Sequence, residues 1–472
     1  MSGPANETVA LDEGARLRRV LIAMALAQFC VNLDFFALNL ALPRMARDLE
    51  VSTTDLQWVV SGYMLALGAF MIPAGRVADI LGRRRVLLLG LVVFSGTGLL
   101  CGLMPSAGPI VGLRLVQGAG AAMIFPVTIA VITNQFPESR RAGAIGLVYG
   151  LGAVGTAAGP FVSGLLVEQL SWRWVFFVVA AFAAIAVPLV LTSVPESRDD
   201  TVPRRIDIGG LVAISLGIAV VTGAVDRGPT SGWTSLLFLG GLVLGGVLLA
   251  TFVGVERRVR WPLVDLALFR NSRYVMVTTA GTVANVCYVV VIFASTLYLQ
   301  EVRGLSPIES GVVFLAPSVA AALAGPASGW LAPRLRPEHV MALALGVGGV
   351  GAAVLSVDAG WALYAAAFVI TGIGLGLGWS FASVGTQAVV RPERAGEASG
   401  VTLTIVIATA GLMVVIAASV IEVISGGEGQ AVDARSIEYV LRALAILALV
   451  AAAGLVALAL RRAHAPSEVL SR

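Results

Sequence analysis

GLVYGLGAVGTAAGPFVSG, at residues 146–164, is the stretch of sequence that decides the fold. It is apolar, it has the length of a bilayer-spanning helix, and small residues recur along it. At about 100° per residue, Gly146 and Gly150 share one helix face, and Gly155 and Gly159 lie roughly opposite. Pro160 removes one amide donor and favours a bend. The spacing predicts a membrane helix that neighbouring backbones approach closely on two sides, and ordinary helix packing is the alternative interpretation.

The composition of the whole chain agrees with a membrane protein. Of its 472 residues, 58% are hydrophobic and 13% are charged, whereas soluble domains carry about 25% charged residues. A helix needs about 20 apolar residues to cross the hydrocarbon, and about fourteen runs qualify. They lie at 20–43, 56–75, 86–104, 110–134, 143–166, 174–194, 209–225, 235–255, 275–298, 310–331, 341–357, 361–387, 400–424 and 438–461. The predicted class is an all-α polytopic membrane protein, with no loop long enough for an enzyme domain.

The basic residues predict the orientation in the membrane. All 32 are Arg. With the N-terminus inside, the outward loops hold only Arg44, Arg47, Arg173, Arg227, Arg303 and Arg435. Because basic residues collect on the cytoplasmic side, both termini are expected in the cytoplasm. The net charge of +4 therefore follows from topology, and we expect no nucleic-acid surface.

An internal repeat organises the chain. Four glycines recur 254 residues later, as Gly75 and Gly329, Gly118 and Gly372, Gly120 and Gly374, and Gly146 and Gly400. Two six-helix bundles in the same orientation explain this offset. The predicted units are a tail at 1–19, a first bundle at 20–194, linkers with an inserted helix pair at 195–273, a second bundle at 274–462 and a tail at 463–472. We expect the inserted pair to be peripheral.

Asp34 is the only acid in the middle of any of these runs. It lies about nine residues, or ~13 Å, from the outer end of its helix. A carboxylate there costs about 2.5–3.5 kcal/mol on insertion scales, so its presence indicates a function. The hydrocarbon penalises the charged form, which favours proton uptake and release. We predict that Asp34 couples transport to protons, with Arg114 as its partner; a buried structural ion pair is the alternative.

A polar stripe on the same helix predicts the substrate cavity. Gln28, Asn32, Phe35 and Asn39 lie within ~60° of one another, and Asp34 points ~120° away. Further candidates for the cavity wall are Tyr149, Asn285, Tyr288, Trp379 and Gln387. Such an apolar, aromatic lining suits lipophilic ligands. For each residue alone, helix packing or an interhelical hydrogen bond is an equally good explanation.

A charged loop joins the second and third runs. It reads GRVADILGRRR at 75–85, and its second-half counterpart at 329–334 lacks the acid. Gly75 and Gly82 permit tight turns, and Asp79 can cap a helix or pair with Arg83. We expect these contacts to hold the two halves together in one state, as a conformational latch. Alternatively, the arginines only enforce topology.

Taken together, these stretches resemble the fourteen-helix drug:proton antiporters of the major facilitator superfamily. The resemblance covers about residues 20–461 and rests on Asp34 to Pro43 in the first helix, the loop at 75–85 and the pattern at 146–164. The last resembles the antiporter motif of the fifth helix, through Gly146, Gly155, Gly159, Pro160 and Gly164. Arg114, with Gln117, Gly118 and Gly120, resembles the fourth-helix motif implicated in proton transfer. The sequence departs from the family at Phe36, where Thr is usual, and at Ile80, where Arg is frequent.

The resemblance implies a secondary transporter that exports lipophilic drugs or antibiotics by alternating access, driven by the proton gradient. We expect a monomer in the cytoplasmic membrane of a bacterium, with protons, small lipophilic substrates and lipids as its partners. No cofactor or metal is expected: there is no phosphate-binding loop for ATP, and Cys30, Cys101 and Cys287 are scattered. The alternatives are a dedicated exporter of one endogenous metabolite and a membrane receptor or scaffold that transports nothing.

Overall fold

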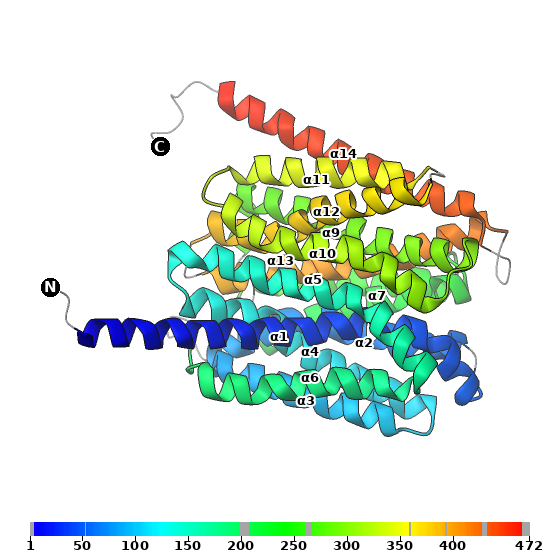
Figure 1. The fold of residues 1–472 in the computed structure, drawn as a ribbon, viewed down its shortest axis with the longest axis horizontal. Helices are drawn as coiled ribbons and strands as arrows, with labels where there is room; N and C mark the ends of the chain where they lie inside the picture. The colour runs from blue at the N-terminus through cyan, green and yellow to red at the C-terminus, as the bar shows by residue number, and fades with distance from the viewer. Residues whose placement is uncertain are drawn as a thin grey trace.

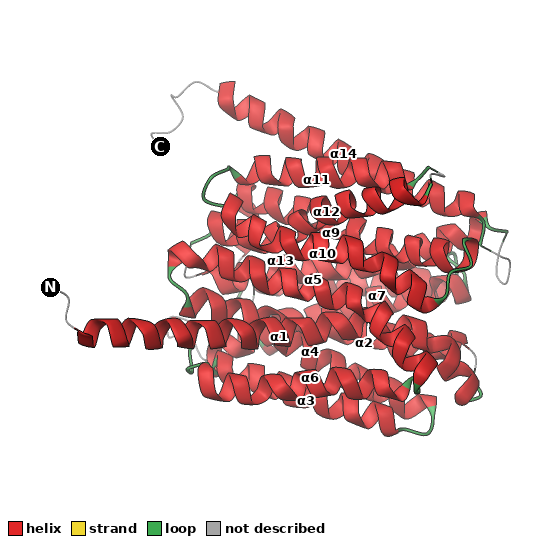
Figure 2. Ribbon diagram, in the orientation of Figure 1, coloured by secondary structure: helices red, strands yellow, loops and turns green. Residues whose placement is uncertain are grey.

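A computed structural model describes residues 4–51, 53–198, 207–259, 262, 264, 266–357, 360–391, 394–426 and 432–464. Within these ranges the chain forms long antiparallel helices joined by short loops (Figures 1 and 2). The first half contains α1 Pro4–Asp48, α2 Thr53–Leu81, α3 Arg83–Leu103, α4 Ala107–Gln135, α5 Glu138–Gln169 and α6 Arg173–Ser193. The inserted pair is α7 Ile208–Ser231 and α8 Leu236–Glu256. The second half contains η1 Leu266–Arg270, α9 Ser272–Leu297, η2 Tyr298–Val302, α10 Pro307–Leu331, α11 Pro337–Leu355, α12 Trp361–Val389, α13 Ala395–Ile424 and α14 Ala434–His464.

The number of helices agrees with the prediction, although some bounds differ. Among the described residues, 13 helices are long and apolar enough to cross a membrane. The first helix, α1, is not among these 13, and the side chains at 36, 39, 40 and 43 are outside the description. It starts at Pro4, so most of the predicted tail at 1–19 is helical. Ala, Leu, Glu and Arg dominate there and favour continuation of the helix. Likewise, α7 runs past the predicted end at 225 to Ser231.

Local signals in the sequence explain where the helices break. The α10 helix starts with a capping box, because Ser306 and Glu309 each bond the other's backbone amide, and Pro307 follows the cap. The α9 helix is capped by Asn271, whose side chain accepts hydrogen bonds from two backbone amides. Between α2 and α3, Gly82 has φ 115°, a conformation that side chains disfavour. The chain therefore turns sharply at that residue.

The two halves repeat the same internal contacts. The α2–α4, α3–α4, α3–α6 and α1–α5 contacts of the first half recur as α10–α12, α11–α12, α11–α14 and α9–α13. The repeated glycines mark equivalent close approaches. A Cβ at Gly118 would meet the Tyr63 carbonyl, and one at Gly372 would meet that of Pro317, again 254 residues later. Both positions require glycine because a neighbouring backbone lies against them.

The halves meet along α5 and α10, which lie side by side in the middle of Figure 1. Glycines permit this contact along the whole length of both helices. A Cβ at Gly146 would collide with the Gly325 carbonyl, and one at Gly150 with the Ala322 carbonyl. We call this contact the α5–α10 seam. It confirms the prediction that a backbone approaches this face of α5 closely.

The symmetry-related contact, between α2 and α13, is built differently. Gly400 is the counterpart of Gly146, and a Cβ there would meet nothing within 4 Å. At Gly68, the counterpart of Ala322, the nearest atom is Cγ2 of Ile218 on α7, 3.7 Å from the Cβ position. The inserted helix α7 contacts both α2 and α13. The inserted pair is thus only partly peripheral: α8 exposes much of its apolar surface, whereas α7 bridges the two halves.

Candidate functional site

Asp34 of α1 and Arg114 of α4 form an ion pair in the interior of the first half. The distance from Asp34 Oδ2 to Arg114 Nη1 is 2.6 Å, and the two side chains are 0% and 1% exposed. The sequence predicted this contact because a charge in hydrocarbon needs a partner. Their role in proton coupling stays a prediction.

Arg114 is held by several groups besides Asp34. Its Nε donates to the Val59 carbonyl at 2.7 Å, and its Nη1 donates to Gln117 Oε1 at 2.8 Å. The guanidinium lies 4.1 Å from the centre of the Tyr63 ring, within the range of a cation–π contact. Asp34 is held less fully, because its Oδ1 has no hydrogen-bond partner within the described chain. The cation is therefore fixed to α2 and α4, whereas the carboxylate is held mainly through one oxygen.

A cavity lies between the two halves, beside this ion pair. About 550 Å³ of space without protein atoms lies between the lining residues, part of it open to the outside. Five predicted residues line it: Asn32, Phe35, Asn285, Tyr288 and Trp379. Its walls come from α1, α2, α4 and α5 of the first half and from α9, α12 and α13 of the second. No Asp, Glu, Arg or His is among the lining residues.

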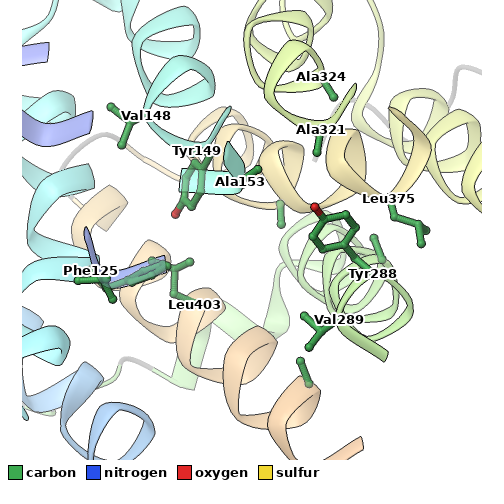
Figure 3. Close-up of a cluster of buried hydrophobic side chains, with 14 of the residues drawn as sticks. Phe125, Val148, Tyr149, Ala153, Tyr288, Val289, Ala321, Ala324, Leu375 and Leu403 are labelled. Carbon is green, nitrogen blue, oxygen red and sulfur yellow. The ribbon is translucent and has the colours of Figure 1, made fainter. Parts of the chain in front are cut away.

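Aromatic rings from both halves meet beside the cavity, in the parts of α4, α5 and α12 that are nearer the side where α1 begins. The rings of Phe125 and Trp379 are 6.5 Å apart, and the Tyr149 ring lies 5.5 Å from that of Trp379. The Ser383 hydroxyl donates to the Tyr149 hydroxyl at 2.7 Å, which joins α12 to α5. In Figure 3, Phe125 and Tyr149 lie on one side of this region and Tyr288 lies on the other. These residues form a floor under the cavity, contributed by both halves.

Three other predicted cavity residues have different surroundings, and a fourth cannot be placed. Tyr149 belongs to the floor. Gln28 is buried, and its amide donates to the Phe125 carbonyl at 3.5 Å. Gln387 lies near the end of α12, where its amide donates to Ser399 at 2.5 Å, and it does not line this cavity. The side chain of Asn39 lies outside the described residues.

The sequence analysis missed eight of the thirteen lining residues, and the repeat accounts for three of them. Ten of the thirteen lining residues form pairs separated by 254 positions. The pairs are Val31 and Asn285, Phe35 and Val289, Phe125 and Trp379, Ala153 and Ile407, and Thr156 and Ala410. Applying the glycine offset to the predicted residues Phe35, Asn285 and Trp379 would have found three of their partners.

The helix that carries the pattern at 146–164 supports the cavity from two sides. One face of α5 forms the seam with α10, and the other lies against α1, because a Cβ at Gly155 would meet the Phe29 carbonyl. On this second face, Thr156 donates to Asn32 Oδ1 at 3.3 Å. Gly159, Pro160 and Gly164 are buried in the same helix. The two-sided close approach is confirmed, and its link to export stays a prediction.

The stretch at 75–85, which was predicted to be a loop, is the end of α2, a turn at Gly82 and the start of α3, and it contacts the segment that follows α6. Arg83 Nη2 lies 2.8 Å from Asp79 Oδ1, which confirms that contact. The Arg83 amide donates to the Ser197 carbonyl at 2.8 Å, and the Arg84 amide donates to Glu196 Oε1 at 3.1 Å. A Cβ at Gly82 would crowd the Glu196 carboxylate. These contacts join α2 and α3 to the segment after α6, and a latch between the halves stays a prediction.

Substitution of Gly82 should destabilise the protein. At φ 115°, Gly82→Ala adds backbone strain of about 1–3 kcal/mol and displaces the Glu196 side chain. We expect a lower midpoint of thermal unfolding in detergent, followed by fluorescence-detected size exclusion. Gly96→Ala in α3 is the control, because a Cβ there meets nothing within 4 Å. Equal midpoints for the two variants would show that the turn tolerates a side chain.

Comparison with known proteins points to one family. The family model described as Major Facilitator Superfamily matches residues 24–413 and 287–471. The multidrug resistance protein Stp of Mycobacterium tuberculosis is 34% identical over 386 residues, covering 81% of this chain and 71% of the relative. The tetracenomycin C resistance and export protein of Streptomyces glaucescens is 32% identical over 388 residues, with the same coverage of both chains.

A solved structure confirms the fold. The crystal structure of the human organic anion transporter MFSD10 superimposes with a TM-score of 0.64, covering 92% of this chain and 99% of that one. Sequence identity is 15%, so the likeness concerns the fold alone.

Proposed function

Because the chain belongs to the major facilitator superfamily and is a multi-pass membrane transporter rather than an enzyme, we propose that it exports lipophilic drugs or antibiotics in exchange for protons. The proposal rests on the buried ion pair between Asp34 and Arg114. Asp34 belongs to α1, the helix that also contributes Asn32 and Phe35 to the cavity wall. The names of the Mycobacterium and Streptomyces relatives support drugs and antibiotics as the substrate class.

The α1 helix provides the physical link between proton and substrate. Asn32 and Phe35 face the cavity, while Asp34 faces Arg114 on α4. Protonation of Asp34 removes its charge and weakens the ion pair, which frees α1 to shift against α4. A substrate in the cavity contacts the same helix, so both ligands bias one two-state element. In the proposed cycle the halves rock on each other and expose the cavity to either side in turn.

The arrangement of the chain supports the remaining features of the proposal. Arg side chains are enriched on the side where α1 begins and α14 ends (left in Figure 1), so we place this side in the cytoplasm. The floor of Phe125, Trp379 and Tyr149 then lies on the cytoplasmic side of the cavity. One copy of the chain supplies both halves and completes the cavity, so a monomer suffices. We propose that the protein is located in the cytoplasmic membrane of a bacterium.

Transport into inside-out membrane vesicles tests the proposal. With an acidic lumen, we expect vesicles that contain the protein to accumulate compounds from a panel of puromycin, Nile red and Hoechst 33342. One pH unit supplies about 1.4 kcal/mol per proton, enough for about tenfold accumulation at one proton per substrate. Nigericin collapses the pH gradient and should therefore abolish the accumulation. Accumulation that resists nigericin would exclude proton exchange, and no accumulation of any compound would contradict drug export.

A further inference from the structure

Tyr288 occupies, in the second half, the position that Asp34 occupies in the first. The two residues are separated by the 254-residue offset that relates the cavity pairs. Arg114 has Phe368 as its counterpart at the same offset, and Phe368 stacks on Tyr364 at 5.1 Å. The second half therefore replaces an ion pair by a hydroxyl and an aromatic ring. The side chain of Tyr288 lies in the cavity wall instead of pairing with a cation.

The polar side chains that line the cavity differ in how many of their hydrogen-bonding atoms are already bonded to other protein groups. Asn32 donates to the Gln28 carbonyl at 2.8 Å and accepts from Thr156. Asn285 donates to the Val406 carbonyl at 3.2 Å. Among the lining side chains, Tyr288 alone has a buried polar atom, its hydroxyl oxygen, without a partner in the described chain. It is 5% exposed, and in Figure 3 its hydroxyl end is on the side of the ring where Ala321 and the cavity residue Ala153 are drawn.

A buried hydroxyl without a partner costs free energy, which a ligand that accepts its hydrogen bond regains. The surrounding wall is apolar and has no charged side chain to compensate a ligand charge. Moving an unpaired ion into such a site costs far more than moving a neutral polar group. The cavity thus favours uncharged molecules with a hydrogen-bond acceptor placed opposite Tyr288.

We propose that Tyr288 is a specificity-determining residue: its hydroxyl donates a hydrogen bond to uncharged lipophilic substrates that carry an acceptor such as a carbonyl. The inference rests on the proposed function and refines its substrate class. The first half then handles the proton through Asp34, and the second half recognises the substrate through the equivalent position.

A matched pair of ligands tests this division. 2-Acetylanthracene and 2-isopropylanthracene have the same ring system and similar volume, but only the first has an acceptor. Their binding is measured by fluorescence on the purified full chain in lipid nanodiscs without a pH gradient, with empty nanodiscs subtracted. We expect Tyr288→Phe to weaken the binding of 2-acetylanthracene about 2- to 10-fold and to leave 2-isopropylanthracene unchanged. Tyr439→Phe is the control, because it removes the same hydroxyl group from an exposed residue of α14 that does not line the cavity.

Each other outcome overturns the proposal. Equal weakening of both ligands by Tyr288→Phe shows that the ring only fills space, and unchanged binding of both removes the hydroxyl from recognition. Lack of binding of either ligand to the wild type also contradicts it. Tetraphenylphosphonium should bind at least tenfold more weakly than 2-acetylanthracene, and tighter binding would refute the preference for uncharged ligands. Because binding is measured without a gradient, failure of proton-driven export in vesicles is a separate result.

Discussion

Asp34→Asn should abolish proton-driven accumulation in inside-out vesicles while the protein stays folded in the membrane. Asn keeps the size of the side chain and still accepts a hydrogen bond from Arg114, but it cannot bind and release a proton. Transport should fall to the level of vesicles without the protein, and the binding of 2-acetylanthracene in nanodiscs should persist. The buried charge of Arg114 loses its counter-ion, at a cost of up to about 3–5 kcal/mol, so size-exclusion profiles must accompany the assay.

Two further variants separate proton coupling from a structural ion pair. Asp48→Asn makes the same substitution on the same helix, where Asp48 accepts from Trp172 Nε1 at 3.1 Å, and we expect it to retain transport. The double variant Asp34→Asn with Arg114→Gln removes both buried charges. If the pair were only structural, this variant should recover transport; if Asp34 carries the proton, it stays inactive. Proton-linked accumulation in Asp34→Asn itself would remove Asp34 from the mechanism.

The ion pair could be predicted from sequence because membrane interiors allow few arrangements of charge. One acid lies in the middle of an apolar run, and one arginine lies deep in another, so each needs the other. The same reasoning applies to the glycines of α5. A helix with small residues on two faces must have close neighbours on both, and the structure supplies α10 and α1. The spacing of small residues along the helix and the free-energy cost of an unpaired charge in the membrane were sufficient to predict these contacts.

Other features depended on how the helices rotate and tilt against one another, which periodicity does not determine. Gln387 shares an apolar helix with Trp379 but lies about two turns nearer the end, beyond the floor of the cavity. Phe125 has no polar group that would mark it as a cavity residue, and only its 254-residue relation to Trp379 places it in the cavity wall. Likewise, α7 has no counterpart in the repeat. Its place between α2 and α13 follows from apolar contacts of Ile72, Ile214 and Val401 that sequence spacing does not encode.

The asymmetry between the two contacts that join the halves leads to the second prediction, a comparison of Gly146→Ala with Gly400→Ala. These glycines occupy equivalent positions in the repeat, and each variant adds one methyl group. At Gly146 the methyl would collide with the Gly325 carbonyl in the α5–α10 seam, whereas at Gly400 it meets nothing within 4 Å.

Overpacking of this kind costs about 1–3 kcal/mol, and if it falls on one conformational state it changes the equilibrium between states about 5- to 150-fold. We therefore expect Gly146→Ala to reduce the initial rate of proton-driven accumulation by about that factor, and Gly400→Ala to retain nearly the wild-type rate. Gly325→Ala, on the opposite side of the seam, should match Gly146→Ala, because its methyl would meet the Gly146 carbonyl. Equal rates in the Gly146 and Gly400 variants would mean that the added methyl group costs the same in every conformational state of the cycle. A loss restricted to Gly146→Ala and Gly325→Ala would mean that the α5–α10 seam is closely packed in one conformational state and looser in another, so that transport requires the two helices to move against each other.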